Sequence, residues 1–324
     1  MRGKMKLYPM KMRPDYHLKP WGGRIMKDMF RKNIPDGLVG ESWEVSMHPG
    51  GMSRVDSGAL KEMTLKALVE TYAEELLGAA ISSKYGRSFP LLVKLLDVNQ
   101  LASVQVHPDD ALAMELEKFP SGKSEAWYII AAKPGHQMFM GFKDGVGRAE
   151  FLAALPEGRA ASLLNKIEVS PGDCVYVPPG TVHACGDGVF MLEIQQSCDI
   201  TYRVYDWDRV DQKGLRRELH IEKAMRAIDF KSRPQVFRAT GAPNALNSVL
   251  RSPYFEVQEL VVASRCHLPP AETCRAGTLL QGDCLLEYQD GKLSLRLGDS
   301  FIVPCGIPVA ITSTSCNIVT TFPT

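Results

Sequence analysis

The 324-residue chain is nearly neutral, with 38 Lys and Arg residues against 37 Asp and Glu residues and a formal net charge of +1. This balance excludes a general electrostatic attraction to nucleic acid or to an anionic membrane surface, so neither is expected as a partner. A hydrophobic content of 45% is sufficient for the buried cores of two domains.

No apolar run approaches the roughly 18 residues that a transmembrane helix needs. The basic residues 1–6 are not followed by the apolar segment of a signal peptide, so we expect a cytoplasmic protein, either a monomer or a weak homodimer. The 8 cysteines include no C-x-x-C pair, which favours buried, reduced thiols over a disulfide framework.

The first part of the chain combines short strands with one helix. Alternating residues over 41–47 predict a half-buried strand, and residues 89–96 form a second, mostly apolar strand. Between them, over 64–77, apolar residues fall at helical spacing while the glutamates lie off that face. We interpret this helix as an excursion from a β-barrel.

Two further strands carry polar residues in apolar surroundings. We predict strands over 101–107 and 123–130, separated by a short helix over 109–117 that Pro108 opens. A second helical stretch is predicted over 147–164.

Residues 169–184 combine a reverse turn, a short apolar strand and a second turn, after which His183 starts the returning strand. Written as a pattern, the segment is Gly172-x5-Pro178-x-Gly180-x2-His183. This pattern resembles the second conserved motif of cupin β-barrels. The resemblance implies that the turn aims the imidazole of His183 into the mouth of a barrel.

The rest of the chain contains a faint repeat. Strand within 191–205 and an amphipathic helix over 219–228 are followed by a predicted linker over 232–247. Beyond it, Gly298-x5-Pro304-x-Gly306 copies the spacing of the first motif, with Val309 where His183 stood. The second motif keeps the turn and loses the imidazole.

These elements predict a mainly β bicupin fold, that is, two jelly-roll cupin barrels with helical insertions in the N-terminal part. We place the first domain at residues 1–235, with helical excursions near 64–77, 109–117, 147–164 and 219–228. The second domain, residues 236–324, is predicted to be a degenerate barrel without a metal site.

If His183 binds a metal, its partners should come from neighbouring strands. Gln105 and His107 lie two residues apart, so their side chains share one face of a strand, and Glu125 lies in the next strand. Two imidazoles, a carboxylate and an amide oxygen suit Zn²⁺, with positions left open for water or substrate. Mn²⁺, Fe²⁺ or Co²⁺ would also bind such a set. We expect one ion per chain.

A structural interpretation competes with the metal interpretation. A histidine in a strand is more often a hydrogen-bonded structural residue than a ligand, and a Gln-x-His pair has little specificity by itself. The metal interpretation therefore depends on the cupin turn around His183. Gln105 is the weakest candidate, because an amide is seldom a direct zinc ligand.

The chain resembles the type I mannose-6-phosphate isomerase family, and within it the short bacterial form. The resemblance lies in ordered blocks, which are together far more specific than any one of them: residues 20–22, 43–46, 90–94, 101–108, 123–125, 180–183 and 201–206. It implies that zinc is held by Gln105, His107, Glu125 and His183.

The family's Tyr-Arg-x-Tyr-Asp segment falls on residues 202–206, which implies that Arg203 lies in the active site. By the same resemblance, Ser103, Lys94 and Lys123 would line the substrate site. Longer members carry a histidine before that lysine, where this chain has Gly122, so a proton-relay role for that histidine does not transfer.

The implied reaction interconverts mannose 6-phosphate and fructose 6-phosphate by moving a proton between C2 and C1 through an enediol. The metal and Arg203 would stabilise the negative charge that develops on oxygen. The base stays open between two residues: Lys123, if burial and neighbouring cations lower its pKa, or Glu193 as a carboxylate. The candidates for binding the phosphate of this hexose 6-phosphate are Lys94, Ser103 and Arg209.

Three other functions remain open at this level. A cupin oxygenase or another sugar epimerase would use similar ligands with Fe²⁺. A non-catalytic sugar-binding bicupin would lack the cations Lys94, Lys123 and Arg203. A cupin-type phosphoglucose isomerase differs only in the stereochemistry at C2.

Overall fold

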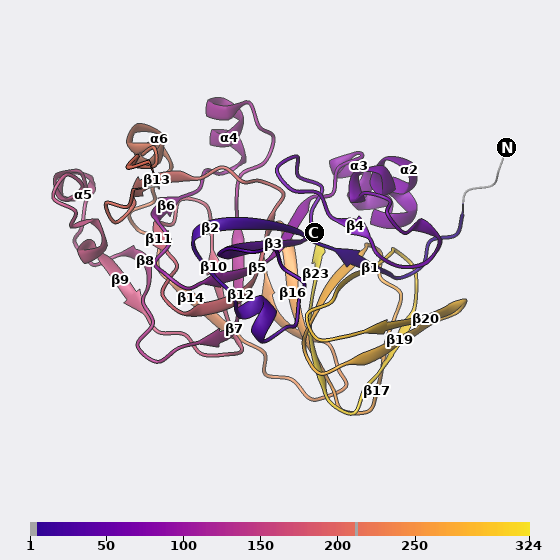
Figure 1. The fold of residues 1–324 in the computed structure, drawn as a ribbon. Coiled ribbons are helices and arrows are strands. Elements are labelled where there is room, and N and C mark those ends of the chain that lie inside the picture. Colours follow the sequence, from indigo (N-terminus) through magenta and orange to yellow (C-terminus); the bar gives the residue numbers. More distant parts are fainter. Residues whose placement is uncertain (1–4, 211–212) are drawn as a thin grey trace.

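The computed structural model describes residues 5–210 and 213–324, so residues 1–4 of the basic N-terminus lie outside the described part of the chain. Antiparallel strands dominate and form four sheets, which confirms the prediction of a mainly β protein. The sheets enclose apolar cores in pairs, and Figure 1 shows the two resulting strand-rich halves side by side. Within the described residues, no helix has the length and apolar character needed to cross a membrane.

The first half, here called the first barrel, consists of a seven-stranded and a five-stranded sheet. In spatial order the larger sheet contains β14 (Gln235–Arg238), β10 (Asp173–Val177), β7 (Glu125–Ala132), β12 (Val189–Gln196), β5 (Leu91–Val98), β3 (Val39–Val45) and β2 (Asp15–Gly23). The smaller sheet contains β13 (Tyr202–Tyr205), β6 (Val104–Val106), β11 (His183–Ala184), β8 (Met138–Phe142) and β9 (Leu164–Ile167).

The second half, the second barrel, consists of a seven-stranded and a four-stranded sheet. The larger sheet contains β15 (Asn247–Arg251), β16 (Phe255–Val262), β23 (Cys316–Pro323), β18 (Arg275–Gln281), β21 (Ser300–Val303), β1 (Met10–Arg13) and β4 (Arg54–Val55). The smaller sheet contains β17 (Arg265–Leu268), β22 (Val309–Thr312), β19 (Cys284–Tyr288) and β20 (Gly291–Leu295).

Strand pairing crosses the domain boundary that the sequence predicts between residues 235 and 236. The N-terminal strand β1 pairs with β21, with Met10 opposite Ile302, and β4 pairs with β1. Within the predicted linker, β14 pairs with β10, with Phe237 opposite Cys174. The predicted boundary therefore falls inside a strand of the first barrel, and the second barrel borrows two strands from the N-terminal part.

Three of the four predicted helices form close to their expected positions. The helices are α1 (Ile25–Asp28), α2 (Leu65–Leu77), α3 (Ala79–Tyr85), α4 (Asp110–Glu117), α5 (Arg148–Ala154) and α6 (Ile221–Ala227). Thr64 and Asp109 cap α2 and α4, because their side chains accept hydrogen bonds from backbone N–H groups of the first turn. The sequence patterns did not indicate α3.

The helix predicted over 147–164 is wrong in length. The structure has only α5 there, followed by a 3-10 turn over Ala160–Leu163 and then by β9. Pro156 has no N–H to continue the helical hydrogen bonds, and Gly158 takes a positive φ of 67°. These two residues end the helix although the apolar spacing continues.

The central strands β5, β7 and β12 are buried on both faces. On β5, the residues Leu91, Val93 and Leu95 pack in an apolar core between the two barrels, together with residues of β16, β18 and β23. Leu96 packs inside the first barrel instead. Because side chains alternate along a strand, Lys94 also points into the first barrel.

The two copies of the turn motif have matching backbone conformations. Gly180 has a φ of 86° and Gly306, at the equivalent position of the second copy, has a φ of 74°. Both lie in the left-handed region, where glycine is not penalised. At Gly180 a Cβ atom would lie 2.9 Å from the carbonyl oxygen of Ala227, so a side chain has no room. The repeat is therefore structural as well as sequential.

The borrowed strand β1 leads to a prediction about fragments. A fragment of residues 239–324 lacks β1 and β4, so the edge of β21 and the apolar core between the barrels are uncovered. We expect this fragment to aggregate or to lack a cooperative thermal transition, measured by circular dichroism and size-exclusion chromatography. A soluble fragment that melts cooperatively would contradict this dependence on β1.

Candidate active site

The interior of the first barrel receives polar side chains from the larger sheet. On β7, Glu125 and Trp127 are two residues apart and point inward, while Tyr128 packs in the core between the barrels. Glu193 of β12 lies opposite both Trp127 and Lys94 in the sheet. The same alternation that buries the apolar residues therefore gathers these polar groups on one inner surface.

The smaller sheet supplies the other predicted residues. Gln105 of β6 lies opposite His183 of β11 on one side and opposite Arg203 of β13 on the other. His107 directly follows β6, and Ser103 directly precedes it. Three short neighbouring strands thus bring these residues to one end of the barrel.

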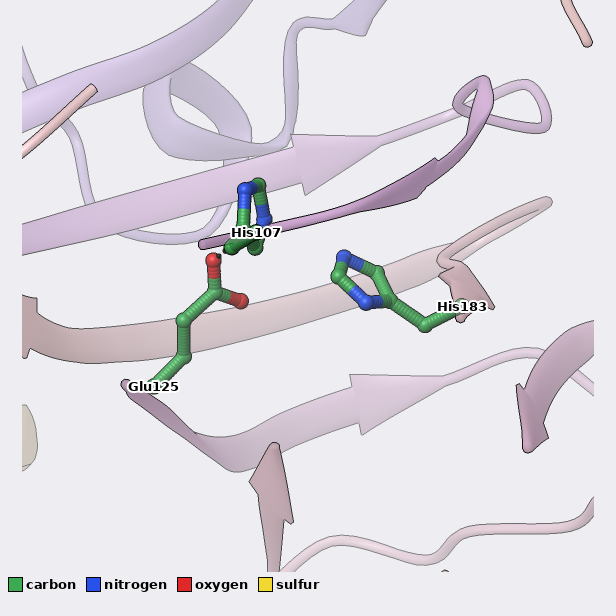
Figure 2. A group of neighbouring side chains, drawn as sticks. All are labelled: His107, Glu125 and His183. Atoms are coloured by element: carbon green, nitrogen blue, oxygen red, sulfur yellow. Dashed lines mark ion pairs between the residues drawn. The ribbon is translucent and has the colours of Figure 1, made fainter. Parts of the chain in front are cut away.

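The predicted ligands His107, Glu125 and His183 form a compact, fully buried group. One ligand atom from each residue lies within 4.8 Å of the others. Figure 2 shows the three side chains converging from separate segments, with Glu125 pointing toward the ring of His107. The Nε2 atom of His107 lies 2.8 Å from Oε1 of Glu125. Elsewhere in the described residues, including the second barrel, no comparable group occurs.

Both rings are oriented as metal-binding histidines are. The Nδ1 atom of His107 lies 2.8 Å from the carbonyl oxygen of Ile200, and that of His183 lies 2.9 Å from the carbonyl oxygen of Thr181. A carbonyl can only accept, so each Nδ1 carries the proton and each Nε2 presents a lone pair. In His107 this lone pair faces a carboxylate oxygen of Glu125. Two facing acceptors repel unless a cation lies close to both. The Nζ atom of Lys123 lies 3.4 Å from Nε2 of His107 and 2.9 Å from Oε1 of Glu125, and a divalent metal also fits this donor set.

The pKa shifts of His107, Glu125 and His183 favour the protonation states that bind a metal cation. Burial lowers the pKa of His183 to about 3, and it also lowers the pKa of His107, so both rings are neutral near pH 7. Burial opposes ionisation of Glu125, but the charge of Lys123 outweighs it and lowers the pKa of Glu125 well below the ordinary value. The group therefore holds two neutral imidazoles and one carboxylate, the form in which such residues bind metal.

The fourth predicted ligand, Gln105, lies at the edge of this group. Its Nε2 atom lies 3.2 Å from Nε2 of His183, and its Oε1 atom accepts a hydrogen bond of 3.1 Å from the hydroxyl of Ser103. The amide is thus adjacent to the lone pair of His183. Its direct role as a ligand stays a prediction.

A cavity of about 270 Å³ opens beside the group. It is lined by most of the residues that the sequence singled out, namely Lys94, Ser103, Gln105, Lys123, Glu193 and Arg203. Sequence reasoning missed several others that line it, namely Lys19, Trp21, Glu41, Trp127, Asp199, Arg217 and His220. For Glu41 a signal was present, because its alternation with Trp43 places both on one face of β3.

Lys94 is the most deeply buried cation of the cavity, with only 2% of its side chain exposed. Its Nζ atom lies 3.2 Å from Glu193, 3.6 Å from Asp199 and 3.8 Å from Glu41. Burial would lower its pKa, but these carboxylates outweigh burial and raise it. Lys94 is therefore a permanent cation that balances buried carboxylates.

The two candidate bases differ in their electrostatics. Burial lowers the pKa of Lys123, but the carboxylates of Glu125, Glu193 and Asp199 reverse this effect and the pKa is raised. The condition under which Lys123 could act as a base is therefore not met. Burial raises the pKa of Glu193 and the charge of Lys94 only partly offsets it. The indole N–H of Trp127 donates to Glu193 at 3.0 Å.

Arg203 is a half-buried cation that has no carboxylate partner in the part of the chain that the structure describes. Its Nε atom donates to the hydroxyl of Ser103 at 3.2 Å, and Nη1 donates to the carbonyl oxygen of Glu218 at 3.1 Å. No ion pair within the described residues involves Arg203. Asp206, the nearby carboxylate, is paired with Arg209 and Arg217 instead. Burial and the charge of Arg217 lower the pKa of Arg203.

Arg209 does not line the cavity. It donates to the carbonyl oxygen of Leu101 at 2.6 Å and pairs with Asp206. Its charge is therefore used in holding the segment after β13 against the loop before β6. A contact between Arg209 and phosphate stays a prediction.

The fold and the site together define a cupin protein with a metal-type His–Glu–His group inside the first of two barrels. Residues 10–132 match the family model described as "Phosphomannose isomerase type I, catalytic domain". The chain is 35% identical to the putative mannose-6-phosphate isomerase YvyI of Bacillus subtilis over 96% of this chain and 98% of that protein. It is 38% identical to the mannose-6-phosphate isomerase of Streptococcus mutans over 91% and 92%.

Solved structures of phosphomannose isomerases are similar to this structure over nearly the whole chain. The mannose 6-phosphate isomerase of Bacillus subtilis superimposes with a TM-score of 0.90 at 34% identity, covering 97% of this chain and 99% of that one. A phosphomannose isomerase from Salmonella typhimurium, at 16% identity and a TM-score of 0.79, shares the fold over 98% of this chain and 100% of that one. The chain belongs to the type I phosphomannose isomerase family, and its length is that of the short bacterial members.

The low pKa of His183 leads to a prediction about stability. Its folded-state pKa of about 3 lies below the ordinary value of 6.5, so the unfolded chain binds the proton first. Stability that is fully present above about pH 6.5 is therefore lost as the pH falls toward 3. In metal-free protein the loss between pH 8 and pH 5 should be on the order of 1–2 kcal/mol. Urea unfolding of chelator-treated protein at both pH values measures it.

The variant His183→Leu is the control, because it removes the titrating ring. Its stability should fall less between pH 8 and pH 5 than that of the wild type. Identical pH dependence in the two proteins would show that the proton is taken up elsewhere.

Proposed function

We propose that this protein interconverts mannose 6-phosphate and fructose 6-phosphate through an enediol. Membership of the phosphomannose isomerase family supports this activity. The main structural support is the position of Arg203 beside the metal-type group. The buried His–Glu–His group adjoins a cavity in which Arg203, an arginine without a carboxylate partner among the described residues, can meet an anionic substrate.

We assign His107, Glu125 and His183 to a single Zn²⁺ ion, with Gln105 as a fourth ligand. When bound, the metal supplies Lewis acidity beside the substrate's C1 and C2 oxygens. The neutral Nε2 atoms and the ionised carboxylate are the ligand forms that zinc requires. Mn²⁺, Fe²⁺ and Co²⁺ accept the same donors, so the choice of zinc is part of the proposal.

Arg203 is assigned to the negative charge of the reaction. Proton removal beside a carbonyl leaves charge on oxygen, and a preorganised cation in a water-poor site stabilises that charge strongly. The hydrogen bond that Nε of Arg203 donates to the hydroxyl oxygen of Ser103 holds the guanidinium at the cavity wall. Ser103 therefore positions Arg203, whose guanidinium is the donor assigned to the substrate.

Glu193 is assigned to proton transfer between C2 and C1. Its raised pKa lies closer to neutrality than that of an exposed carboxyl, which favours accepting and returning a proton. Lys123, held as a cation 2.9 Å from Glu125, is assigned to orienting that carboxylate. The indole N–H of Trp127 donates to both Glu125 and Glu193, and we assign Trp127 to positioning these two carboxylates.

The three candidates for binding the phosphate, Lys94, Ser103 and Arg209, differ in how well the structure supports them. Lys94 is paired with Glu193, and Arg209 is paired with Asp206, so either would have to exchange its carboxylate for phosphate. Ser103 has no competing carboxylate among the described residues, but its hydroxyl donates to Gln105, and this hydrogen bond would have to be exchanged. We therefore assign Ser103, after that exchange, as the first phosphate or hydroxyl donor, and Lys94 to positioning Glu193.

The activity and the metal are tested together. Purified protein should convert fructose 6-phosphate to mannose 6-phosphate in a coupled assay, contain one tightly bound metal per chain by elemental analysis, and lose activity on chelation. His183→Ala should lose both metal and activity, whereas His267→Ala, an exposed histidine of the second barrel, should keep both. Metal-loaded protein that turns over neither hexose phosphate would contradict the proposed isomerase activity.

Arg203→Ala should reduce kcat by roughly 10²- to 10³-fold, because it removes a donor aimed at developing charge. Metal content and the unfolding midpoint should stay near those of the wild type, since the side chain of Arg203 is linked to the predicted ligand Gln105 through Ser103 and the backbone pairing of the two strands is kept. Arg216→Ala is the matched control, because Arg216 is exposed and, among the described residues, its ion pair is with Asp208. A near-wild-type kcat for Arg203→Ala would contradict the role of Arg203.

A further inference from the structure

The sheet register assigns equivalent positions in the two barrels. In the first barrel Val177 of β10 lies opposite Glu125 of β7, and in the second barrel Val303 of β21 lies opposite Arg275 of β18. Val177 and Val303 both directly precede the proline of the repeated Gly-x5-Pro motif. Arg275 therefore occupies the position that the metal-type carboxylate occupies in the first barrel.

The other ligand positions of the second barrel are apolar. Val309 of β22 lies opposite Leu268 of β17, where the first barrel has His183 opposite Gln105. Both Val309 and Leu268 are buried in the core of the second barrel. The second barrel has thus lost its ligands for a cation and gained a positive charge at the same place.

Arg275 is a buried cation without a partner. Only 8% of the residue is exposed, and its Nε atom has no hydrogen-bond partner among the described residues. No ion pair among the described residues involves it, and its guanidinium carbon lies 5.9 Å from the ring of Phe322. Burial lowers the pKa of Arg275, and the carboxylate of Glu256 offsets only part of this effect. Glu256 is itself paired with Arg251 and accepts a hydrogen bond from Gln258. An unpaired buried charge is costly, so the position calls for an anion.

A small cavity adjoins Arg275. Its walls come from the turn motif and from the loop before β18, and they include Pro269, Ile307 and Val309. Thr273 also lines it, and the buried hydroxyl oxygen of Thr273 has no hydrogen-bond partner. The space suits a single small species, of the size of a water molecule or a halide ion. Two unsatisfied donors therefore face a cavity that contains no carboxylate.

We propose that this cavity binds a small inorganic anion of the size of chloride, held by Arg275 and Thr273. A water molecule would fill the same space but would leave the charge of Arg275 uncompensated. The small size of the cavity favours a monatomic anion over phosphate or an organic carboxylate. At equivalent positions, the first barrel therefore presents a carboxylate to a metal cation and the second presents a guanidinium to an anion.

Anion binding at this site stabilises the second barrel. The site exists only when β18, β21 and β22 are assembled, so the anion binds the folded state and not the unfolded chain. The cavity shares no lining residue with the candidate active site. Isomerase activity should therefore be independent of anion binding.

The direct test replaces chloride by bromide, which has a usable X-ray absorption edge. Diffraction data from wild-type crystals soaked in bromide should show an anomalous peak between the guanidinium of Arg275 and the hydroxyl of Thr273. No peak at that position in crystals that bind bromide elsewhere would overturn the proposal.

The solution test compares chloride with gluconate, a larger anion, at constant ionic strength. Chloride should raise the apparent Tm of the wild type by on the order of 2 °C. Arg275→Met should lose this response, and Arg296→Met, which removes an exposed arginine of the same barrel, should keep it. Equal responses in the wild type and Arg275→Met would contradict the site.

A second variant guards against misfolding of Arg275→Met. Thr273→Val keeps the charge and the shape but removes one donor, so it should fold and show a smaller chloride response than the wild type. An unchanged response would remove Thr273 from the site, and with it the proposed geometry.

Discussion

The burial of β5, β7 and β12 on both faces is the constraint on which the rest of this molecule depends. One face of each strand supplies the apolar core between the barrels, so only the inner face is left for chemistry. Because side chains alternate with a period of two, Lys94, Glu125 and Glu193 all point to that interior. Their distance from bulk water strengthens every electrostatic interaction among them.

Charges buried in this way must compensate each other. Lys94 balances Glu193, Lys123 balances Glu125, and the indole of Trp127 donates to both carboxylates. Breaking one buried pair typically costs about 3–5 kcal/mol, because the remaining charge has no partner. The network of buried charges that forms the site therefore also stabilises the first barrel. Arg203 differs from the other predicted cations of the cavity, because among the described residues it has no carboxylate partner.

The two barrels use one turn for different purposes. The first barrel couples the turn to His183 and a carboxylate, while the second couples it to Val309 and Arg275. The second barrel also takes β1 and β4 from the N-terminal part, and its larger sheet closes the core on which β5, β7 and β12 pack. It thereby supports the rigidity of the site without contributing a residue to the cavity.

The sequence by itself determined the local features: the turn around Gly180, the capped helices α2 and α4, and the set of residues that converge on the His–Glu–His group. Turn chemistry, capping and strand alternation act over a few residues, so the sequence reveals them directly. Tertiary structure alone decided the pairing of β1 with β21, the assignment of Arg209 to Asp206 rather than to the cavity, and the position of Arg275. These depend on contacts between segments far apart in the chain, for which no short pattern exists, because the partner of a buried charge or an edge strand is set by the assembled sheets.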